Sequence, residues 1–289
     1  MTDPFSTLTS ALADRYTIER ELGRGGAAAV FLAKDLRHHR KVALKILRPE
    51  VAEAVGRDRF LKEIEVAAGL IHPHIVPLFD SGDASGVLYF VMPFVEGESL
   101  RARLDREGAL PVDEAVRIAR ELADALGYAH AHGVIHRDVK PENVLLEAGH
   151  AMLADFGVAR AVHLEEDQRL TRSGMAVGTP AYMSPEQAAG DEQVDGRSDQ
   201  YALGCLLYEM LTGIAPYSGP SSESVIRQHL AGTPTPVRQV RAAVPEGVAA
   251  ALGRAMAKVP PDRFGCMEAF DAALDGALQG AIGRVRPFS

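Results

Sequence analysis

The sequence predicts an α+β protein of two parts, an antiparallel sheet with one helix followed by a mainly helical part. Strand-like patterns occupy much of the chain before Val95, whereas apolar residues after Val95 recur at helical spacing. The length of 289 residues exceeds that of most single compact cores. It therefore favours one two-lobed unit or two small domains.

The first part is predicted to contain a meander of three strands, then one helix and two more strands. Residues 57–70 carry apolar side chains at helical spacing, and His72 and Pro73 would end that helix. The stretch 81–86, rich in Gly, Ser and Asp, is expected to be a turn. The strands, marked by alternation or by runs of Val, Ile, Leu and Phe, are predicted at residues 16–22, 30–34, 41–47, 75–79 and 87–92.

The second part is predicted to be mainly helical. A helix over residues 111–130 begins at Pro111 and carries a stripe of Ala and Leu side chains. Residues 198–211 are apolar on nearly every side, which indicates a central buried helix. Further segments of this kind are predicted at residues 223–230, 246–258 and 268–278, with residues 280–289 as a frayed end.

Composition and charge narrow the class of protein. A net charge of −8 and a pI of about 5.7 argue against a nucleic-acid surface, which needs a basic face. Cys205 and Cys266 lie in apolar helical patterns, so both are expected to be core residues in a reducing compartment. Residues 1–13 lack a signal-peptide pattern, and the longest uncharged apolar run, 87–95, is about half of the ~20 residues that span a membrane. We therefore expect a cytoplasmic chain with no membrane segment and no nucleic-acid partner.

The most informative segment is 136–143, with the sequence HRDVKPEN, followed by an Asp-Phe-Gly tripeptide that begins at Asp155. Asp138 would accept the proton of an attacking hydroxyl, and Lys140 could contact a transferring phosphate. Asn143 and Asp155 offer hard oxygen ligands to Mg²⁺. Each residue alone would be an ordinary loop residue, but the order and spacing of the two motifs favour phosphoryl transfer.

These motifs resemble the catalytic core of the protein kinases, and HRDVKPEN resembles the serine/threonine branch of the bacterial Hanks type. The resemblance covers residues 16–278 and implies a bilobal protein-kinase-like fold, with an N-lobe at about 16–95 and a C-lobe at about 96–278. Residues 1–15 and 279–289 would be terminal tails. Proteins of this kind often continue into a linker and a membrane anchor, and some form homodimers through the N-lobe.

The resemblance also implies an activity. The chain would be an ATP-dependent serine/threonine protein kinase that transfers the γ-phosphoryl group to protein Ser and Thr hydroxyls, with Mg²⁺, or alternatively Mn²⁺, as the metal. Two other interpretations share part of these motifs: a pseudokinase that only binds partners, and a small-molecule phosphotransferase. The first would lack the lysine, base or metal ligand, and the second would lack a peptide-docking segment, here residues 178–186.

The sequence GRGGAAAV at residues 23–30 lies between two predicted strands. A glycine-rich turn in this setting covers nucleotide phosphates with backbone N–H groups, although a plain hairpin turn fits as well. Ala28 stands where the kinase pattern has a third glycine, and its methyl group would hold the loop slightly off the phosphates. Nucleotide contacts are expected from Leu22, Gly23, Arg24, Gly25, Gly26 and Val30.

Lys45, on the third predicted strand, is either a snorkelling surface lysine or a phosphate ligand, and the surrounding motifs favour the ligand. By the resemblance, Glu63 on the predicted helix would pair with Lys45 through tertiary packing. Glu65 is the competing residue, but it lies ~200° around the helix from Glu63 and is expected to face solvent.

Residues 92–95 resemble the hinge that reads adenine between the two lobes. Pro93 has no N–H, yet its position is expected to offer only a carbonyl, with the N–H of Val95 as donor. The remaining adenine contacts are expected from Met92 in the hinge and from Val30, Ala43 and Leu145, which also fit plain core positions.

The long segment between Asp155 and Glu186 resembles an activation segment. Thr171 and Ser173 are candidate phosphosites, and a phosphate on either could dock on Arg137 and order the segment.

Three residues in and around this segment have expected polar partners. Thr179 would hydrogen-bond Asp138 and Lys140, which is a feature of hydroxyl-directed kinases. Two structural supports are also expected, a Glu186–Arg263 pair and an Asp199 carboxylate that holds the backbone of the His-Arg loop.

Overall fold

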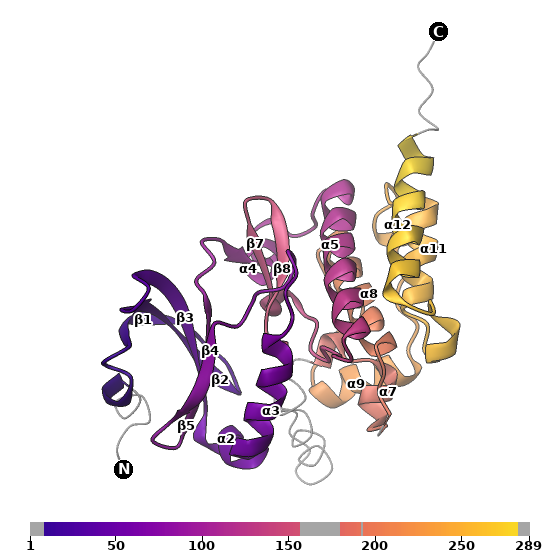
Figure 1. Ribbon diagram of the computed structural model, residues 1–289. Coiled ribbons are helices and arrows are strands. Elements are labelled where there is room, and N and C mark those ends of the chain that lie inside the picture. The colour runs from indigo at the N-terminus through magenta and orange to yellow at the C-terminus, as the bar shows by residue number, and fades with distance from the viewer. Residues whose placement is uncertain (1–8, 157–179, 192, 283–289) are drawn as a thin grey trace.

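A five-stranded sheet forms the main part of the N-terminal lobe (Figure 1). The computed structural model describes residues 9–156, 180–191 and 193–282. The strands of the sheet are β1 (Tyr16–Arg24), β2 (Ala28–Asp35), β3 (Arg40–Leu47), β4 (Asp80–Ala84) and β5 (Val87–Pro93). All neighbours pair antiparallel in the order β1-β2-β3-β5-β4, so the meander predicted for the first three strands is confirmed.

The strand predicted at residues 75–79 is wrong, because the chain is irregular there and the strand follows as β4. Ile75 makes one isolated bridge to Leu153, and the Val76 N–H donates to the Leu153 carbonyl at 2.9 Å. The side chain of Ile75 packs in the core of the C-terminal lobe and that of Val76 in the core of the N-terminal lobe. The apolar residues of this stretch therefore join the lobes instead of covering one face of a sheet.

Two helices follow β3, where the sequence predicted one. They are α2 (Pro49–Val55) and α3 (Arg57–Ala68). Pro49 occupies the first turn of α2, where its missing N–H has no cost, and Gly56 at φ 75° separates the two helices. α3 buries Phe60 and Ile64 in the core of the N-terminal lobe and Ala67 in the core of the C-terminal lobe.

The C-terminal lobe is mainly helical, as predicted, and it also carries a small sheet of three strands (Figure 1). That sheet contains β6 (Glu98–Ser99), β7 (Val144–Glu147) and β8 (His150–Leu153). The helices are α4 (Leu100–Glu107), α5 (Val112–Ala131), α7 (Pro185–Ala189), α8 (Arg197–Thr212), α9 (Ser222–Ala231), α10 (Val237–Val240), α11 (Glu246–Ala255) and α12 (Met267–Ile282), with 3-10 turns η1 (Pro141–Asn143), η2 (Pro180–Tyr182) and η3 (Pro260–Asp262).

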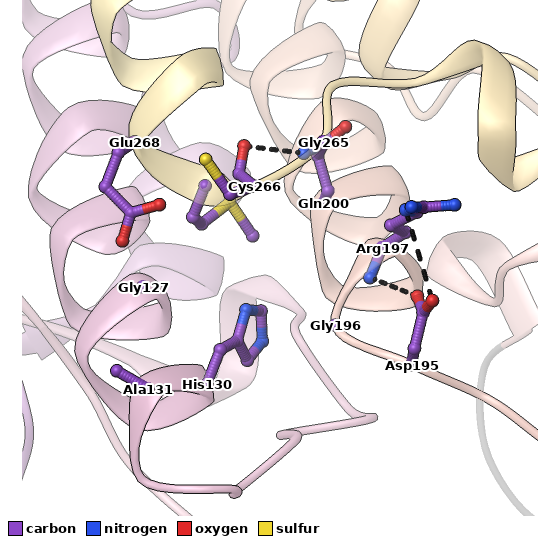
Figure 2. Close-up of a pocket in the computed structure, with 11 residues that line it drawn as sticks. Gly127, His130, Ala131, Asp195, Gly196, Arg197, Gln200, Gly265, Cys266 and Glu268 are labelled. Atoms are coloured by element: carbon purple, nitrogen blue, oxygen red, sulfur yellow. Dashed lines mark hydrogen bonds and ion pairs between the residues drawn. The ribbon is translucent and has the colours of Figure 1, made fainter.

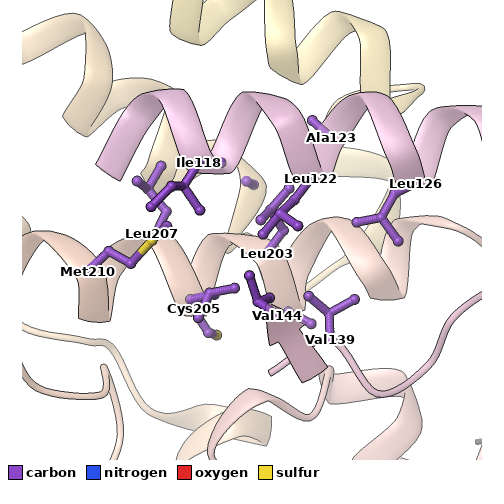
Figure 3. Close-up of a cluster of buried hydrophobic side chains, with 14 of the residues drawn as sticks. Ile118, Leu122, Ala123, Leu126, Val139, Val144, Leu203, Cys205, Leu207 and Met210 are labelled. Carbon is purple, nitrogen blue, oxygen red and sulfur yellow. The ribbon is translucent and has the colours of Figure 1, made fainter. Parts of the chain in front are cut away.

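The centre of this lobe is the packing of α5 against α8 (Figure 3). Leu122 and Leu126 of α5 and Leu203 of α8 are fully buried there, and each such side chain contributes ~1.5–3 kcal/mol relative to exposure. Cys205 is buried on α8, as predicted, whereas Cys266 is exposed just before α12, so the core position expected for it is wrong. Its neighbours in the sequence are apolar, but the chain has not yet entered the helix.

No helix among the described residues combines the length and the apolar character needed to cross a membrane.

Candidate active site

The catalytic loop, residues 136–143, is anchored by Asp199, which lies in the first turn of α8. Its two carboxylate oxygens accept the backbone N–H groups of His136 at 2.8 Å and Arg137 at 2.7 Å, and His130 lies 2.7 Å from Oδ2. Burial acts to raise the pKa of Asp199, but these hydrogen bonds and the His130 charge outweigh it and hold the pKa below its usual value. The predicted support of the His-Arg loop is therefore confirmed.

His136 links the catalytic loop to the segment that begins at Asp155. Its Nδ1 accepts the Asp138 N–H at 3.2 Å, which leaves Nε2–H to donate to the Ala154 carbonyl at 2.8 Å. The ring meets the Phe156 ring edge-on at 4.6 Å between centroids. These contacts fix the spacing between the two motifs that the sequence singled out.

Lys140 and Asn143 both contact the carboxylate of Asp138. Asp138 Oδ2 lies 2.6 Å from Lys140 Nζ and accepts a hydrogen bond from Asn143 Nδ2 at 3.0 Å. Burial acts to lower the pKa of Lys140, but the carboxylates of Asp138, Glu142 and Asp155 raise it above its usual value. Lys140 therefore stays charged beside the expected base.

Lys45 reaches across the lobes from β3 to Asp155. The two side chains are 2.5 Å apart, and both are largely shielded from solvent. Asp155 has φ 71°, a left-handed conformation that is uncommon outside glycine and typical of functional sites. Among the described residues, the carboxylate that pairs with Lys45 is that of Asp155, so the expected Lys45–Glu63 pair is not formed in this structure. Glu63 is half-buried on α3 and Glu65 is exposed, as expected.

Apolar side chains from both lobes meet beside this ion pair. Ala43 and Met92 are buried in one cluster with Ala154, and β3 and β5 pair Ala43 with Met92. Pro93 ends β5 opposite Val42, and Val95 follows it in the connection to the second lobe. The cluster also holds the partly buried side chains of Leu22 (β1), Val30 (β2), Leu145 (β7) and Met152 (β8).

The glycine-rich turn connects β1 and β2. The Gly25 N–H donates to the Ala28 carbonyl at 2.9 Å, and Ala28 itself is buried. Arg24 pairs with Glu21 at 2.7 Å on the outside of the turn. Gly23 lies in β1, and a Cβ placed on Gly23 would meet no atom within 4 Å. The space beside Gly23 at the end of β1 is therefore open.

The docking segment described by the structure begins at Pro180 and is held at two points. Glu186 pairs with the fully buried Arg263 through both oxygens, at 2.7 and 2.8 Å, which confirms the predicted pair. Gln187 caps its own helix with Ser184 and donates to the Arg137 carbonyl at 2.9 Å. The Gln187 bond ties the docking segment to the catalytic loop, and no motif in the sequence pointed to it.

Thr171, Ser173, Thr179 and the part of the docking segment before Pro180 lie outside the described residues.

A separate cavity of ≈ 370 Å³ lies where α5, α8 and the turn before α12 meet (Figure 2). His130 lines it, and the Nε2 atom of the same ring bonds Asp199. Gln200 faces the cavity and holds the turn through the carbonyl of Cys266 at 3.3 Å. This cavity adjoins the anchor of the catalytic loop and contains none of the expected catalytic residues.

The two metal ligands expected from the sequence suit Mg²⁺, which does not need a site built wholly from protein side chains. Asp155 supplies a carboxylate, and Asn143 directs its Nδ2 to Asp138, which leaves its carboxamide oxygen for a metal. In the part of the chain that the structure describes, no group of three or more His, Cys, Asp or Glu side chains could hold a metal ion. Mg²⁺ typically takes one or two protein ligands and completes its shell with phosphates and water.

Fold and site together define a phosphotransferase of the protein kinase class. The chain belongs to the protein kinase family, since residues 16–273 match the family described as "Protein kinase domain". Its relatives place it among the bacterial Hanks-type serine/threonine protein kinases, which are ATP-dependent phosphotransferases.

Three of these relatives are mycobacterial enzymes. The chain is 46% identical over 264 residues to serine/threonine-protein kinase PknD of Mycobacterium tuberculosis, covering 90% of this chain and 39% of that protein. It is 42% identical over 263 residues to PknB of Mycobacterium leprae, covering 88% and 41%. It is also 42% identical over 268 residues to PknB of Mycolicibacterium smegmatis, covering 89% and 42%. The chain thus spans about two fifths of the length of these curated relatives.

Proposed function

We propose that this domain transfers the γ-phosphoryl group of ATP to Ser or Thr hydroxyls of protein substrates. The observation that carries the proposal is the convergence of Asp138, Lys140 and Asn143 beside the Lys45–Asp155 pair, with an apolar cluster from both lobes next to it. General base, cationic groups and hard oxygen ligands in one place are what phosphoryl transfer requires.

Asp138 acts as the base in this proposal. Its carboxylate takes the proton of the substrate hydroxyl while that oxygen bonds to the γ-phosphorus and the bond to the ADP oxygen breaks. Lys140, already charged beside Asp138, stabilises the negative charge on the transferring group. Asn143 orients Asp138 through its Nδ2 hydrogen bond.

Asn143 and Asp155 hold the metal in this proposal, with Mg²⁺ as the first expectation and Mn²⁺ as the alternative. The ion, when bound, neutralises charge on the nucleotide phosphates. Lys45 then exchanges Asp155 for the phosphates, and Glu63 on α3 becomes its carboxylate partner. The half-buried position of Glu63 on α3 supports this exchange.

The adenine ring is proposed to lie in the apolar cluster between the lobes. Its edge would be read by the carbonyl of Pro93 and the N–H of Val95, since Pro93 ends the buried strand β5 and Val95 lies two residues beyond it. The faces and the phosphate end of the nucleotide would contact Leu22, Gly23, Arg24, Gly25, Gly26, Val30, Ala43, Met92 and Leu145.

Phosphorylation of the domain itself is proposed at Thr171 and Ser173, with Arg137 as the docking cation. The left-handed Arg137 backbone, φ 68°, and the tie from Gln187 to its carbonyl fix this residue between base and docking segment. Thr179 would contact Asp138 and Lys140 when a protein substrate binds.

We propose residues 16–278 as the catalytic domain, with an N-lobe of about 16–95, and protein substrates as its partners.

The cytoplasm is the proposed location, because ATP is available there and both cysteines are free thiols. The N-lobe is proposed to form homodimers, supported by the exposed apolar side chains of Leu36 and Phe79. No nucleic-acid role is proposed, given the net charge of −8.

One assay tests the function. Radiolabelled ATP with Mg²⁺ is incubated with the chain alone, with histone and with an aminoglycoside. The proposal expects label on histone Ser and Thr and on the chain. Label on the aminoglycoside alone would identify a small-molecule phosphotransferase, and ATP binding without any transfer would identify a pseudokinase.

A further inference from the structure

Lys258 lies in the loop between α11 and η3, where it caps the end of α9. Its ammonium donates to the His229 carbonyl at 2.7 Å and the Gln228 carbonyl at 3.1 Å, both in the last turns of α9. It also donates to Tyr217 Oη at 2.8 Å and lies 3.4 Å from Tyr201 Oη on α8. A cation at the C-terminal carbonyls of a helix is favoured by the helix dipole.

Arg263, five residues further along the same loop, holds the other side of the docking segment. It pairs with Glu186 of α7 and donates to the carbonyls of Ala257 and Lys258. The Tyr201 ring lies between the two cations, 4.9 Å from the Arg263 guanidinium carbon and 5.7 Å from Lys258 Nζ. One short loop thus places a cation against α7 and another against α9.

α9 in turn supports the docking segment, because it packs against both η2 and α7. His229 of α9 is fully buried, with the backbone of Pro180 and Ala181 beside its ring, and its Nδ1 is 3.0 Å from Tyr201 Oη. Pro180 directly follows Thr179. A shift of α9 would therefore move the residues next to Thr179, which is proposed to contact Asp138 and Lys140 when a protein substrate binds.

We propose that Lys258 is a positioning residue for the protein substrate, acting through the C-terminal end of α9 on residues 180–182. This inference rests on the proposed function, because it concerns the site that binds the protein substrate. ATP binding is not involved, since the residues proposed to contact the nucleotide lie on or beside β1, β2, β3, β5 and β7, and Lys258 contacts neither these nor Lys140, Asn143 and Asp155.

The Lys258 cap should respond to pH. Burial, with the nearby Arg263 charge, lowers the pKa of Lys258 to about 8. The other groups facing it are the Tyr201, Tyr217, Cys205 and His229 side chains. Burial raises the pKa of the two tyrosines and the cysteine, that of Tyr217 to about 12, and lowers the pKa of His229 to about 4, so all four stay neutral near pH 8. The neutral amine has two donor hydrogens for the four oxygens around it.

Loss of the Lys258 proton should weaken binding of the protein substrate and raise the free energy of unfolding. Because the pKa of Lys258 is lower in the folded chain than its ordinary value of 10.5, the unfolded chain binds the extra proton between about pH 8 and 10.5. The contribution of Lys258 to the free energy of unfolding therefore rises with pH in this window. A purely structural role predicts no loss of function there, whereas a positioning role predicts weaker substrate binding.

The test compares Lys258→Met, which removes the cap, with Lys258→Arg, which keeps the charge at every pH used. The control is Lys34→Met, at an exposed lysine on β2. KM for histone and KM for ATP are measured at pH 7 and pH 9, and melting temperatures are recorded for each protein. Loss of hydrogen bonds to a charged group predicts a rise in histone KM on the order of tenfold for Lys258→Met, with KM for ATP unchanged.

The pH profile of the wild-type histone KM is a test that can be measured even if a variant does not fold. Its histone KM should rise several-fold between pH 7 and pH 9, and that of Lys258→Arg should not. A flat wild-type profile, or the same rise in Lys258→Arg, overturns the inference alone. Absence of wild-type transfer to histone overturns the proposed function as well, so the two failures are distinguishable.

Discussion

At the scale of single residues, the site depends on carboxylates that are each held by several donors. Asp199 accepts two backbone N–H groups and a histidine, and Asp138 accepts from Lys140 and Asn143. The first carboxylate is buried and fixes the loop, whereas the second is partly exposed, as a base that meets a substrate hydroxyl must be. The two roles follow from burial.

Asp138→Asn should lower turnover by ~10²–10⁴, the usual range for a lost general base. The substitution keeps the size of the side chain, so the melting temperature should stay close to that of the wild type. Initial rates with labelled ATP and histone measure the effect. Near-normal transfer by a correctly folded variant would contradict the assigned role of Asp138.

Glu186→Gln should lower the free energy of unfolding by ~3–5 kcal/mol, because it leaves the Arg263 guanidinium buried without its carboxylate. The matched control is Glu223→Gln, which breaks an exposed pair with Arg227 and should cost less than ~1 kcal/mol. Urea unfolding of the three proteins measures both values. Equal losses in the two variants would show that burial of the Glu186 pair has no special weight.

At the scale of elements, short segments carry the groups that order the site, and helix ends are used repeatedly. Asp199 lies in the first turn of α8, and Ser184 caps α7 in a reciprocal pair with Gln187. The end of α9 is capped by Lys258 from another loop. The positions of these ends fix the catalytic loop and the docking segment more directly than the middles of the helices do.

α9 also carries a group that should make the fold sensitive to acid. Burial, with the Lys258 charge, lowers the pKa of His229 to about 4, against an ordinary value of 6.5. The unfolded chain therefore binds a proton between pH 6.5 and 4 that the folded chain does not. The free energy of unfolding should fall by ~3 kcal/mol across this window and stay low below it.

Urea unfolding at pH 7, 5.5 and 4.5 checks this for the wild type and for His229→Gln, which lacks the titrating ring. The difference between the two proteins should shrink as the pH falls. His39→Asn is the control, because His39 is exposed and Asn tolerates its φ of 53°. A constant difference between wild type and His229→Gln would contradict the lowered pKa.

At the scale of the whole molecule, the sequence predicted what local pattern can encode. Apolar periodicity indicated α5 and α8, and the spacing of Asp138, Lys140 and Asn143 indicated the catalytic loop. β4 was missed because its polar residues form a strand only by pairing with β5 at the sheet edge.

Interactions between distant segments were predicted where the family resemblance supplied them, as for the Glu186–Arg263 pair, and missed where it did not. Lys45 and Asp155 are 110 residues apart in the chain, so only lobe packing decides which carboxylate the lysine meets. Gln187 lay in no motif, and its bond to the Arg137 carbonyl depends on how the docking segment folds back over the loop. Contacts between segments far apart in sequence are fixed by tertiary structure, which propensity does not report.

The Lys45–Asp155 pair joins the two lobes, so nucleotide and metal should compete with it and stabilise the whole domain. At a concentration 100 times its dissociation constant, Mg·ATP should add ~2.7 kcal/mol to the free energy of unfolding and raise the melting temperature by about 5 °C or more. Asp155→Asn removes the metal carboxylate and also frees Lys45. In that variant, ATP should still stabilise the domain, but Mg²⁺ should add little to the ATP effect. Thermal unfolding with ATP plus a chelator, and with ATP plus Mg²⁺, measures the increment due to the metal without any catalysis. An increment of equal size in wild type and variant would remove Asp155 from the metal site.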